Sequence, residues 1–246
     1  SAPGQLGISR AFVNGDIEIH GDIYEAFDRL YRNRRDVSPK TAVALAPQLA
    51  PFLLKRVPPP PEEVRLLGRL HGKGRDAKAI SHHYDVSNTF YRWVLGPSMA
   101  YTCAVFPKID STLEEAQDEK FDLVCRKLGL RKGMRLLDVG CGWGGMVRHA
   151  AKHYGVQVVG VTLSQAQAQW GRQVLEDEGL TGQAQIRHCD YRDVTESDFD
   201  AVSSIGLTEH IGRSNYADYF TFLRGKLKPE GRLLNHCITR TDPRSK

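Results

Sequence analysis

The chain has 246 residues, a formal net charge of +5, 41% hydrophobic residues and 26% charged residues, which is ordinary for a globular protein that buries a sizeable core. Its five cysteines form no CxxC pair, and no window approaches the roughly 18 apolar residues of a membrane span, so a disulfide scaffold and a transmembrane protein are disfavoured. The first residues lack a charged-then-apolar leader pattern. We therefore expect a cytoplasmic protein whose contact with any membrane is peripheral.

The first segment combines a turn signal with a helix signal. Residues 11–19 alternate in polarity around Asn14-Gly15, which predicts a small hairpin. Asp22 is placed to cap a helix that runs to about Arg34.

A second helical piece is expected over residues 41–55, and the proline run at 58–61 predicts a stiff spacer. We place a flexible boundary after this run. Residues 1–75 are then an accessory region, and residues 76–246 form the main domain.

The main domain begins with aromatic-rich segments after residue 80 and continues with a helix at 112–128. Strand-like runs then alternate with helices, which predicts an α/β fold with a doubly wound, mostly parallel, Rossmann-like sheet. The five expected strands cover residues 135–139, 156–161, 184–188, 201–205 and 232–238.

The stretch Leu136-Leu137-Asp138-Val139-Gly140-Cys141-Gly142-Trp143-Gly144 joins the first strand to a helix. Glycines allow a tight turn and close approach of a ligand, and the helix start offers unpaired N–H groups, so the stretch predicts a nucleotide-type cofactor cradle. A dinucleotide fold needs an acid after the second strand, about 20 residues on. Thr162-Leu163-Ser164 stands there instead, and the loop resembles the first motif of class I S-adenosylmethionine (SAM) methyltransferases.

Four sequence blocks identify a particular family among these methyltransferases. They are residues 83–88 (HYDVSN), 101–104 (YTCA), the Gly140 loop with 160–164 (GVTLS), and 204–212 (SIGLTEHIG). Together they resemble the cyclopropane-fatty-acid synthase family, which includes mycolic acid cyclopropane synthases and fatty-acid C-methyltransferases. The resemblance covers roughly residues 80–238, and residues 16–24 look like the N-terminal extension of longer bacterial members.

The resemblance implies a SAM site and a bicarbonate site, and no metal. The SAM-binding residues that it implies are Tyr101, Thr102, Leu136, Asp138, Gly140, Cys141, Gly142, Trp143, Gly144, Thr162, Leu163, Ser164, Gln167, Tyr191 and Arg192. The residues that it implies for bicarbonate are Cys103, Glu209, His236 and Ile238, and a further tyrosine of the family falls beyond residue 246.

The implied chemistry explains these residue types. An isolated alkene attacks only a strongly activated methyl group, and the resulting cation must lose a proton. Bicarbonate oriented by Glu209 and His236 would take that proton. The ring faces of Tyr84, Tyr101 or Phe106 would stabilise positive charge by cation–π attraction, worth about 2 kcal/mol when desolvated.

Taken singly, the same residues have simpler interpretations: His236 as a hydrogen-bonded core histidine, Glu209 as an acid at a helix start, and Cys103 as a small buried hydrophobe. The implied activity is methyl transfer to the alkene of an unsaturated acyl chain, in phospholipid, giving a cyclopropane. Methylene- or methyl-branched products, an N- or O-methyltransferase and an inactive SAM-binding module stay open. Nucleic acid is disfavoured because no Asp/Asn-Pro-Pro-aromatic run follows the fourth strand, where residues 206–209 stand.

Two expectations concern assembly. A seven-stranded sheet is usual for this class, and the sequence accounts for five strands, so we expect the remaining strands to lie outside the given residues or to be supplied elsewhere. A homodimer is left open. The accessory region is expected either to recruit the enzyme to an anionic membrane surface, at the inner face of the membrane, or to pack on the main domain or on a second subunit. The basic and apolar residues that suggest recruitment are Arg29, Arg32, Arg34, Arg35, Lys40, Ile23, Phe27 and Leu30.

Overall fold

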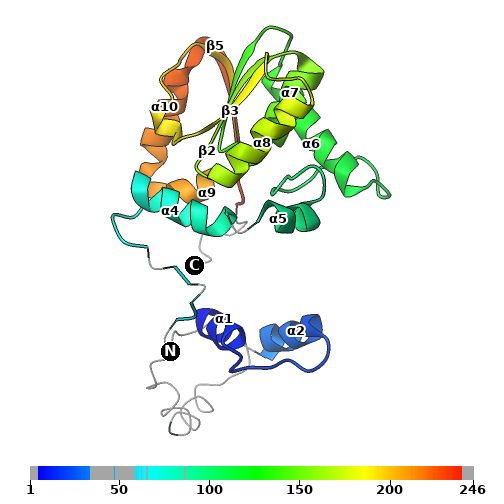
Figure 1. The fold of residues 1–246 in the computed structure, drawn as a ribbon, viewed down its shortest axis with the longest axis vertical. Coiled ribbons are helices and arrows are strands. Elements are labelled where there is room, and N and C mark those ends of the chain that lie inside the picture. Colours follow the sequence, from blue (N-terminus) through cyan, green and yellow to red (C-terminus); the bar gives the residue numbers. More distant parts are fainter. Residues whose placement is uncertain are drawn as a thin grey trace. The chain divides into compact units, whose positions relative to one another are not determined.

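The computed structural model describes residues 5–33, 47, 59–61, 63–64, 66–85 and 87–239, and the chain divides into two compact units, residues 1–65 and 66–246 (Figure 1). This division lies somewhat before the boundary expected at residue 75. Apart from Pro47, the helical piece expected at residues 41–55 lies outside the described residues.

The first unit contains helices α1 (Gln5–Val13) and α2 (Ile23–Asn33). The hairpin expected at residues 11–19 is wrong, because residues 11–13 form the end of α1. Asn14 and Gly15 close the helix: their N–H groups donate to the carbonyls of Arg10 and Phe12, and Gly15 has φ +75°. An Asn-Gly pair supplies the left-handed backbone that ends a helix as readily as the turn of a hairpin.

The helix expected after Asp22 is confirmed as α2. Asp22 Oδ1 accepts a hydrogen bond from the backbone N–H of Tyr24 at 2.7 Å, which caps the helix. On its surface, Arg29 pairs with Glu25 and Arg32 pairs with Asp28, one helical turn away in each case. Two of the four arginines that were expected to face an anionic surface, Arg29 and Arg32, thus already have acidic partners.

The second unit is built on a five-stranded, fully parallel sheet with the strand order β3-β2-β1-β4-β5, which confirms the predicted fold class. The first four strands lie within two residues of their predicted bounds, whereas the last begins five residues early. The strands are β1 (Arg135–Val139), β2 (Gln157–Thr162), β3 (Ala184–His188), β4 (Phe199–Ile205) and β5 (Leu227–His236).

Helices cover both faces of the sheet. One core cluster joins Leu136 and Val158 to residues of α6 (Leu113–Leu128), α7 (Gly145–Tyr154) and α8 (Gln165–Asp177). The other joins Leu137 and Val202 to α10 (Tyr216–Lys226). Because neighbouring strand residues point to opposite faces, the buried β1 side chains serve both clusters.

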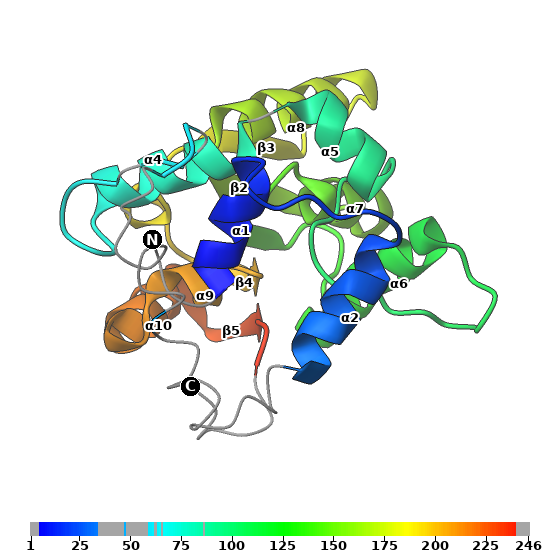
Figure 2. The ribbon, with the colours of Figure 1, turned by 90° about the horizontal axis from the view of Figure 1, so that it is seen from below.

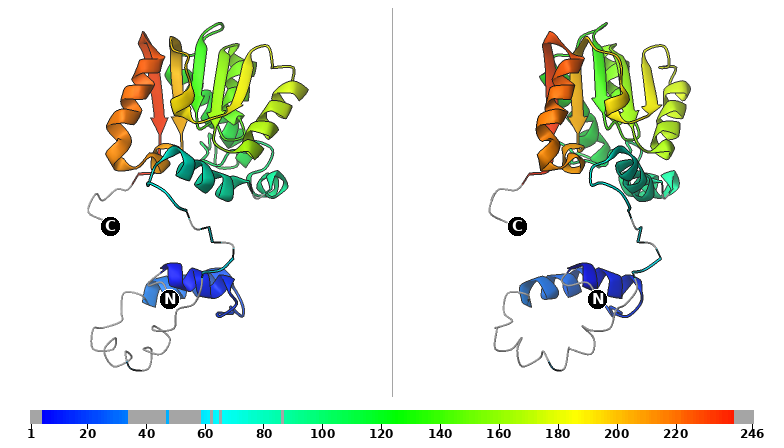
Figure 3. Two further views of the ribbon diagram at one scale, coloured as in Figure 1. Left: turned by 60° about the vertical axis from the view of Figure 1, so that its left-hand side comes forward. Right: turned by 90° about the vertical axis from the view of Figure 1, so that its left-hand side faces the viewer.

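The arrowheads of all five strands point toward the end of the sheet where α4 (Lys73–Tyr84), α5 (Asn88–Leu95) and α9 (Thr208–Ile211) lie (Figure 3). Seen from that end, α4 and α5 run beside α8 (Figure 2). In parallel α/β sheets, ligands bind at the carboxyl ends of the strands. Within the described part of the chain, no helix is long and apolar enough to span a bilayer.

Candidate active site

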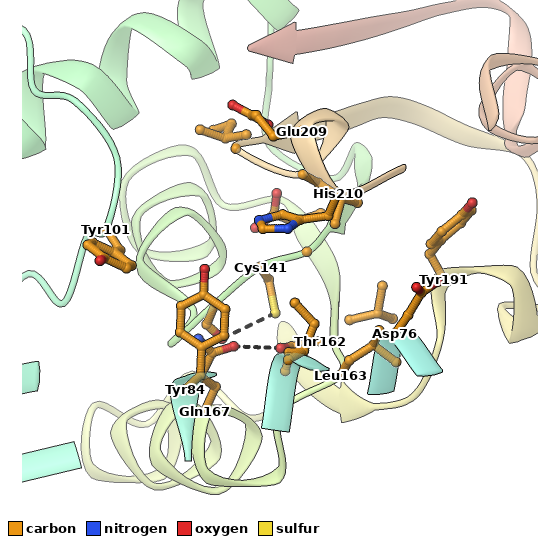
Figure 4. A pocket seen from close by; sticks show the side chains of 18 of the residues that line it. Asp76, Tyr84, Tyr101, Cys141, Thr162, Leu163, Gln167, Tyr191, Glu209 and His210 are labelled. Atoms are coloured by element: carbon orange, nitrogen blue, oxygen red, sulfur yellow. Dashed lines mark hydrogen bonds between the residues drawn. The ribbon is translucent and has the colours of Figure 1, made fainter. Parts of the chain in front are cut away.

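A cavity of about 380 Å³ lies at the carboxyl ends of the strands, beneath α4. Its wall combines the loops after β1, β2, β3 and β4 with α4 and the segment that precedes α6. Figure 4 shows the side chains that line it, with Tyr84 and Tyr101 on the left of the view and Tyr191 on the right.

The loop after β1 forms one side of the cavity through backbone that only glycine adopts easily. Gly140, Gly142 and Gly144 have φ angles of +74°, +56° and +87°. A Cβ on Gly142 would meet nothing within 4 Å, and this residue lines the cavity, so the missing side chain leaves ligand space. A Cβ on Gly144 would instead collide with Ile186, and Gly144 does not line the cavity. Gly142 therefore leaves open space in the cavity wall, whereas Gly144 allows close packing against Ile186.

The loop after β2 presents a hydroxyl–amide pair where a dinucleotide fold would have an acid. Thr162 donates to Gln167 Oε1 at 2.7 Å, and both residues line the cavity (Figure 4). Ser164 does not line it: this side chain caps α8 by accepting from Gln167 N at 3.1 Å and donates to Asp85. Thr162 and Gln167 are thus the groups available to a ribose, and Ser164 holds them in place.

An aromatic cluster closes another side. Tyr84 meets Tyr101 and Trp143 edge-on, with ring centroids 6.1 Å and 6.0 Å apart. Asn88 accepts from Trp143 Nε1 at 2.8 Å, which explains why a polar residue stands at the start of α5. Phe106 is exposed and does not line the cavity. Of the three rings that were expected to stabilise positive charge, those of Tyr84 and Tyr101 thus line the cavity.

The loop after β3 contributes Tyr191 and Arg192, both in the cavity wall. Arg192 is already engaged: the guanidinium donates to Asp190 at 2.6 Å and 2.7 Å and to Asp76 of α4 at 3.4 Å. Arg192 thus connects the β3 loop to α4, which covers the cavity.

The four residues implied for bicarbonate are brought together in two pairs. Glu209 Oε1 accepts from the backbone N–H of Ile238 at 2.7 Å, and Cys103 Sγ lies 3.4 Å from His236 Nε2. His236 Nδ1 is buried and has no hydrogen-bond partner among the described residues. Of the four, Glu209 lines the cavity, and Cys103 follows the cavity-lining Thr102.

Two buried ionisable groups, Asp138 and Lys120, line the cavity, and the resemblance implied only the first of them. Burial raises the pKa of Asp138 to about 6, although Ser203 donates to this carboxylate at 2.6 Å. Lys120 of α6 was missed; burial lowers the pKa of this ammonium to about 8, and it donates to Thr102 Oγ1 at 2.8 Å.

Most of the residues implied for SAM line one cavity. Those that do are Tyr101, Thr102, Asp138, Gly140, Cys141, Gly142, Trp143, Thr162, Leu163, Gln167, Tyr191 and Arg192, joined by the acyl-site candidate Tyr84. Leu136, Gly144 and Ser164 lie behind it: Leu136 is fully buried in the core. His210 also lines the cavity and was not singled out, although it follows Glu209 directly.

A parallel sheet with a glycine loop after β1, a hydroxyl–amide pair after β2 and a cavity between them has the fold of the SAM-dependent methyltransferases. A family model described as mycolic acid cyclopropane synthetase matches residues 71–246, and the chain belongs to this family.

Three relatives illustrate the similarity. "Probable fatty acid methyltransferase Rv3720" of Mycobacterium tuberculosis is 56% identical over 258 residues, which cover 100% of this chain and 60% of the relative. The "Cyclopropane-fatty-acyl-phospholipid synthase" of Escherichia coli is 41% identical over 172 residues, 70% of this chain and 44% of the relative. The solved structure of "mycolic acid cyclopropane synthase CmaA1 complexed with SAH and CTAB" is 38% identical with a TM-score of 0.62, covering 65% of this chain and 55% of that one. The chain thus spans 60% or less of the length of these relatives.

Proposed function

We propose that this chain belongs to an enzyme that transfers a methyl group from SAM to the double bond of an unsaturated fatty acyl chain in phospholipid, giving a cyclopropane fatty acid. The observation that carries this proposal is the pairing of Glu209 with Ile238 and of Cys103 with His236 next to the cavity. An N- or O-methyltransferase would have no need for such a set, because its substrate carries its own lone pair. The names of the relatives, fatty acid methyltransferase and cyclopropane synthase, agree with the proposal.

SAM would lie against the Gly140–Gly142 loop, with Thr162 and Gln167 available to its ribose. When bound, it supplies an activated methyl group. The open space over Gly142 is the observation of this structure that fits such a ligand. Support also comes from the SAH named in the CmaA1 structure.

Bicarbonate fits the second set of residues. When bound, it supplies a base for the proton that leaves the alkylated acyl chain. Glu209 offers a carboxylate that accepts from an O–H group, and the unpartnered Nδ1 of His236 is a buried polar atom that needs a partner. Residues 103, 209, 236 and 238 would thus hold the ion and fix its orientation.

Aromatic residues beside the cavity would stabilise the positive charge that develops on the acyl chain. The rings of Tyr84 and Tyr101 line the cavity and pack with those of Trp143 and Tyr91 in one aromatic cluster. Burial raises the pKa of Tyr84, so the phenol stays neutral and its ring remains available for a cation–π contact.

The alternative outcome of the same methyl transfer is a methylene- or methyl-branched acyl chain. The relative named fatty acid methyltransferase, at 56% identity, is the observation that favours it. Proton NMR of lipids from cells expressing the full-length protein distinguishes the products, since ring protons resonate upfield and exocyclic methylene protons in the olefinic region.

The test of the proposed function is Glu209→Gln. The amide oxygen of glutamine can still accept from Ile238 N–H, so the local structure is retained while the carboxylate charge is lost. We expect turnover to fall by roughly 10²–10⁴-fold, the usual contribution of acid–base catalysis, with SAM affinity nearly unchanged.

The matched control is Glu230→Gln, an exposed glutamate of β5, which should keep wild-type turnover. Full activity of Glu209→Gln, or of the wild-type enzyme in bicarbonate-depleted buffer, would exclude this role.

A further proposal concerns membrane recruitment by the first unit. The exposed Tyr24 and Phe27 of α2 support apolar insertion, while the Arg29–Glu25 and Arg32–Asp28 pairs reduce the free positive charge of that helix. Apolar insertion is thus the stronger support for an acyl substrate that stays in the bilayer.

A further inference from the structure

Residues 101–103 form no helix or strand, yet this segment links the two halves of the candidate site. Tyr101 and Thr102 line the cavity, and Cys103 contacts His236 at 3.4 Å. A segment without backbone pairing of its own needs other groups to hold it, because fixing each residue costs about 1–2 kcal/mol of conformational entropy.

Helix α6 supplies two side chains that hold this segment, and both bind Thr102. Lys120 Nζ donates to Thr102 Oγ1 at 2.8 Å, and Gln117 Nε2 donates to the Thr102 carbonyl at 3.0 Å. The two donors are three residues apart and therefore lie on one face of the helix. Both are buried, with exposed fractions of 6% for Lys120 and 3% for Gln117.

Helix α6 and the loop after β4, which contact Thr102 from two sides, are themselves held in place. The first turn of α6 is fixed by a reciprocal capping box between Thr112 and Glu115. On the other side of Thr102, a Cβ on Gly206 would come within 2.9 Å of Thr102 Cγ2, so the threonine methyl group packs directly on that glycine after β4. Thr102 is thus held between α6 and the β4 loop.

Burying Lys120 costs free energy, because a buried ammonium loses much of its hydration. Partial compensation comes from the Phe121 ring, whose centroid lies 4.3 Å from Lys120 Nζ, and from the negative charge of Asp138. A neutral side chain of similar length would avoid this loss of hydration. The presence of lysine therefore points to a role that needs its N–H donors.

We propose that Lys120 is a positioning residue, which acts through Thr102 to fix segment 101–103 between the SAM-binding loop and the bicarbonate-holding residues. The proposal rests on the proposed function. The competing role is purely electrostatic, with Lys120 serving only as the counter-ion of Asp138.

Two double-mutant cycles separate the roles, with SAM affinity measured by calorimetry and turnover measured at saturating SAM. The first cycle combines Lys120→Met with Thr102→Val, and the second combines Lys120→Met with Asp138→Asn. We expect each single change in the first cycle to weaken SAM binding about tenfold, and the double variant to be no weaker than the worse single one. Lys127→Met, an exposed lysine of the same helix, is the matched control and should bind SAM as the wild type does.

Because Lys120 itself lines the cavity, additive losses in the first cycle would overturn the proposal: in favour of the counter-ion role if the second cycle shows coupling, and of a direct contact with the ligand if it does not. So would wild-type affinity and turnover in Lys120→Met. If Lys120→Met does not fold, Thr102→Ser and Thr102→Val decide: the hydroxyl-bearing serine variant should bind SAM about tenfold more tightly, and equal affinities would contradict the proposal. Failure of the proposed function is a separate result, namely a wild-type enzyme that binds SAM and alkylates no acyl chain.

Discussion

Gly142→Asn tests the candidate cofactor site, because a side chain added at this position would extend into the cavity without colliding with the protein. Gly142 has φ +56° and no atom within 4 Å of an added Cβ. Asparagine tolerates left-handed backbone better than other non-glycine residues, so we expect a folding cost of only about 1 kcal/mol. The new side chain would occupy the cavity that SAM needs.

Gly179→Asn is the matched control. Gly179 has φ +66°, also with nothing within 4 Å of an added Cβ, and it does not line the cavity. For a unit of this size, a cost of 1 kcal/mol lowers Tm by about 2–4 °C, and both variants should show such a shift. Only Gly142→Asn should lose SAM affinity, by at least about 100-fold or roughly 2.7 kcal/mol in calorimetry. Equal SAM affinity of the two folded variants would refute the cofactor assignment.

Four further outcomes are expected. Gly144→Ala should lower the unfolding free energy by roughly 3 kcal/mol in urea titrations, because its Cβ would collide with Ile186 at φ +87°. Asn88→Leu should destabilise the protein by about 1–3 kcal/mol, because it leaves the buried Trp143 Nε1 without its acceptor. Co-sedimentation with anionic liposomes should weaken with salt and be lost on deletion of residues 1–65, and equal binding by the deleted protein would exclude recruitment by that unit. Asp138→Asn should flatten the pH dependence of stability between about pH 4 and pH 7.

The sheet could be predicted from the sequence because its signals are local. Strands β1 and β3 have the predicted bounds. The first is a short apolar run, the second alternates apolar and polar residues, and turn residues delimit both. Thr112 also caps α6 as its position before an acidic first turn indicates. The strand β5 was placed too late because its first half, Leu227–Gly231, contains lysine, proline and glutamate. In that half Leu227 pairs with Phe199 of β4, and regular pairing resumes at Arg232 after a register shift.

Residues whose role depends on a distant partner were harder to predict. A lysine in an amphipathic helix gives no sign that it will be buried against Thr102 and Asp138, because both partners belong to other elements. Similarly, Ser164 was expected to bind a cofactor on the strength of the resemblance, whereas its hydroxyl caps α8. Identical motif residues can thus serve the ligand or the loop that holds it, and only the fold separates the two.

The pH prediction follows from the sign of the shift at Asp138. Burial raises the pKa of this carboxyl from an ordinary value near 3.8 to about 6, so the folded state holds its proton more tightly than the unfolded state does. This stabilisation is fully present below about pH 4 and is lost as the pH rises through 6. Lys120, with a pKa of about 8, stays charged throughout that window and contributes a constant amount. Relative to Asp138→Asn, the wild type should therefore lose roughly 3 kcal/mol of unfolding free energy between pH 4 and pH 7 in urea titrations. Parallel pH profiles of the two proteins would show that the carboxyl titrates alike in the folded and unfolded states.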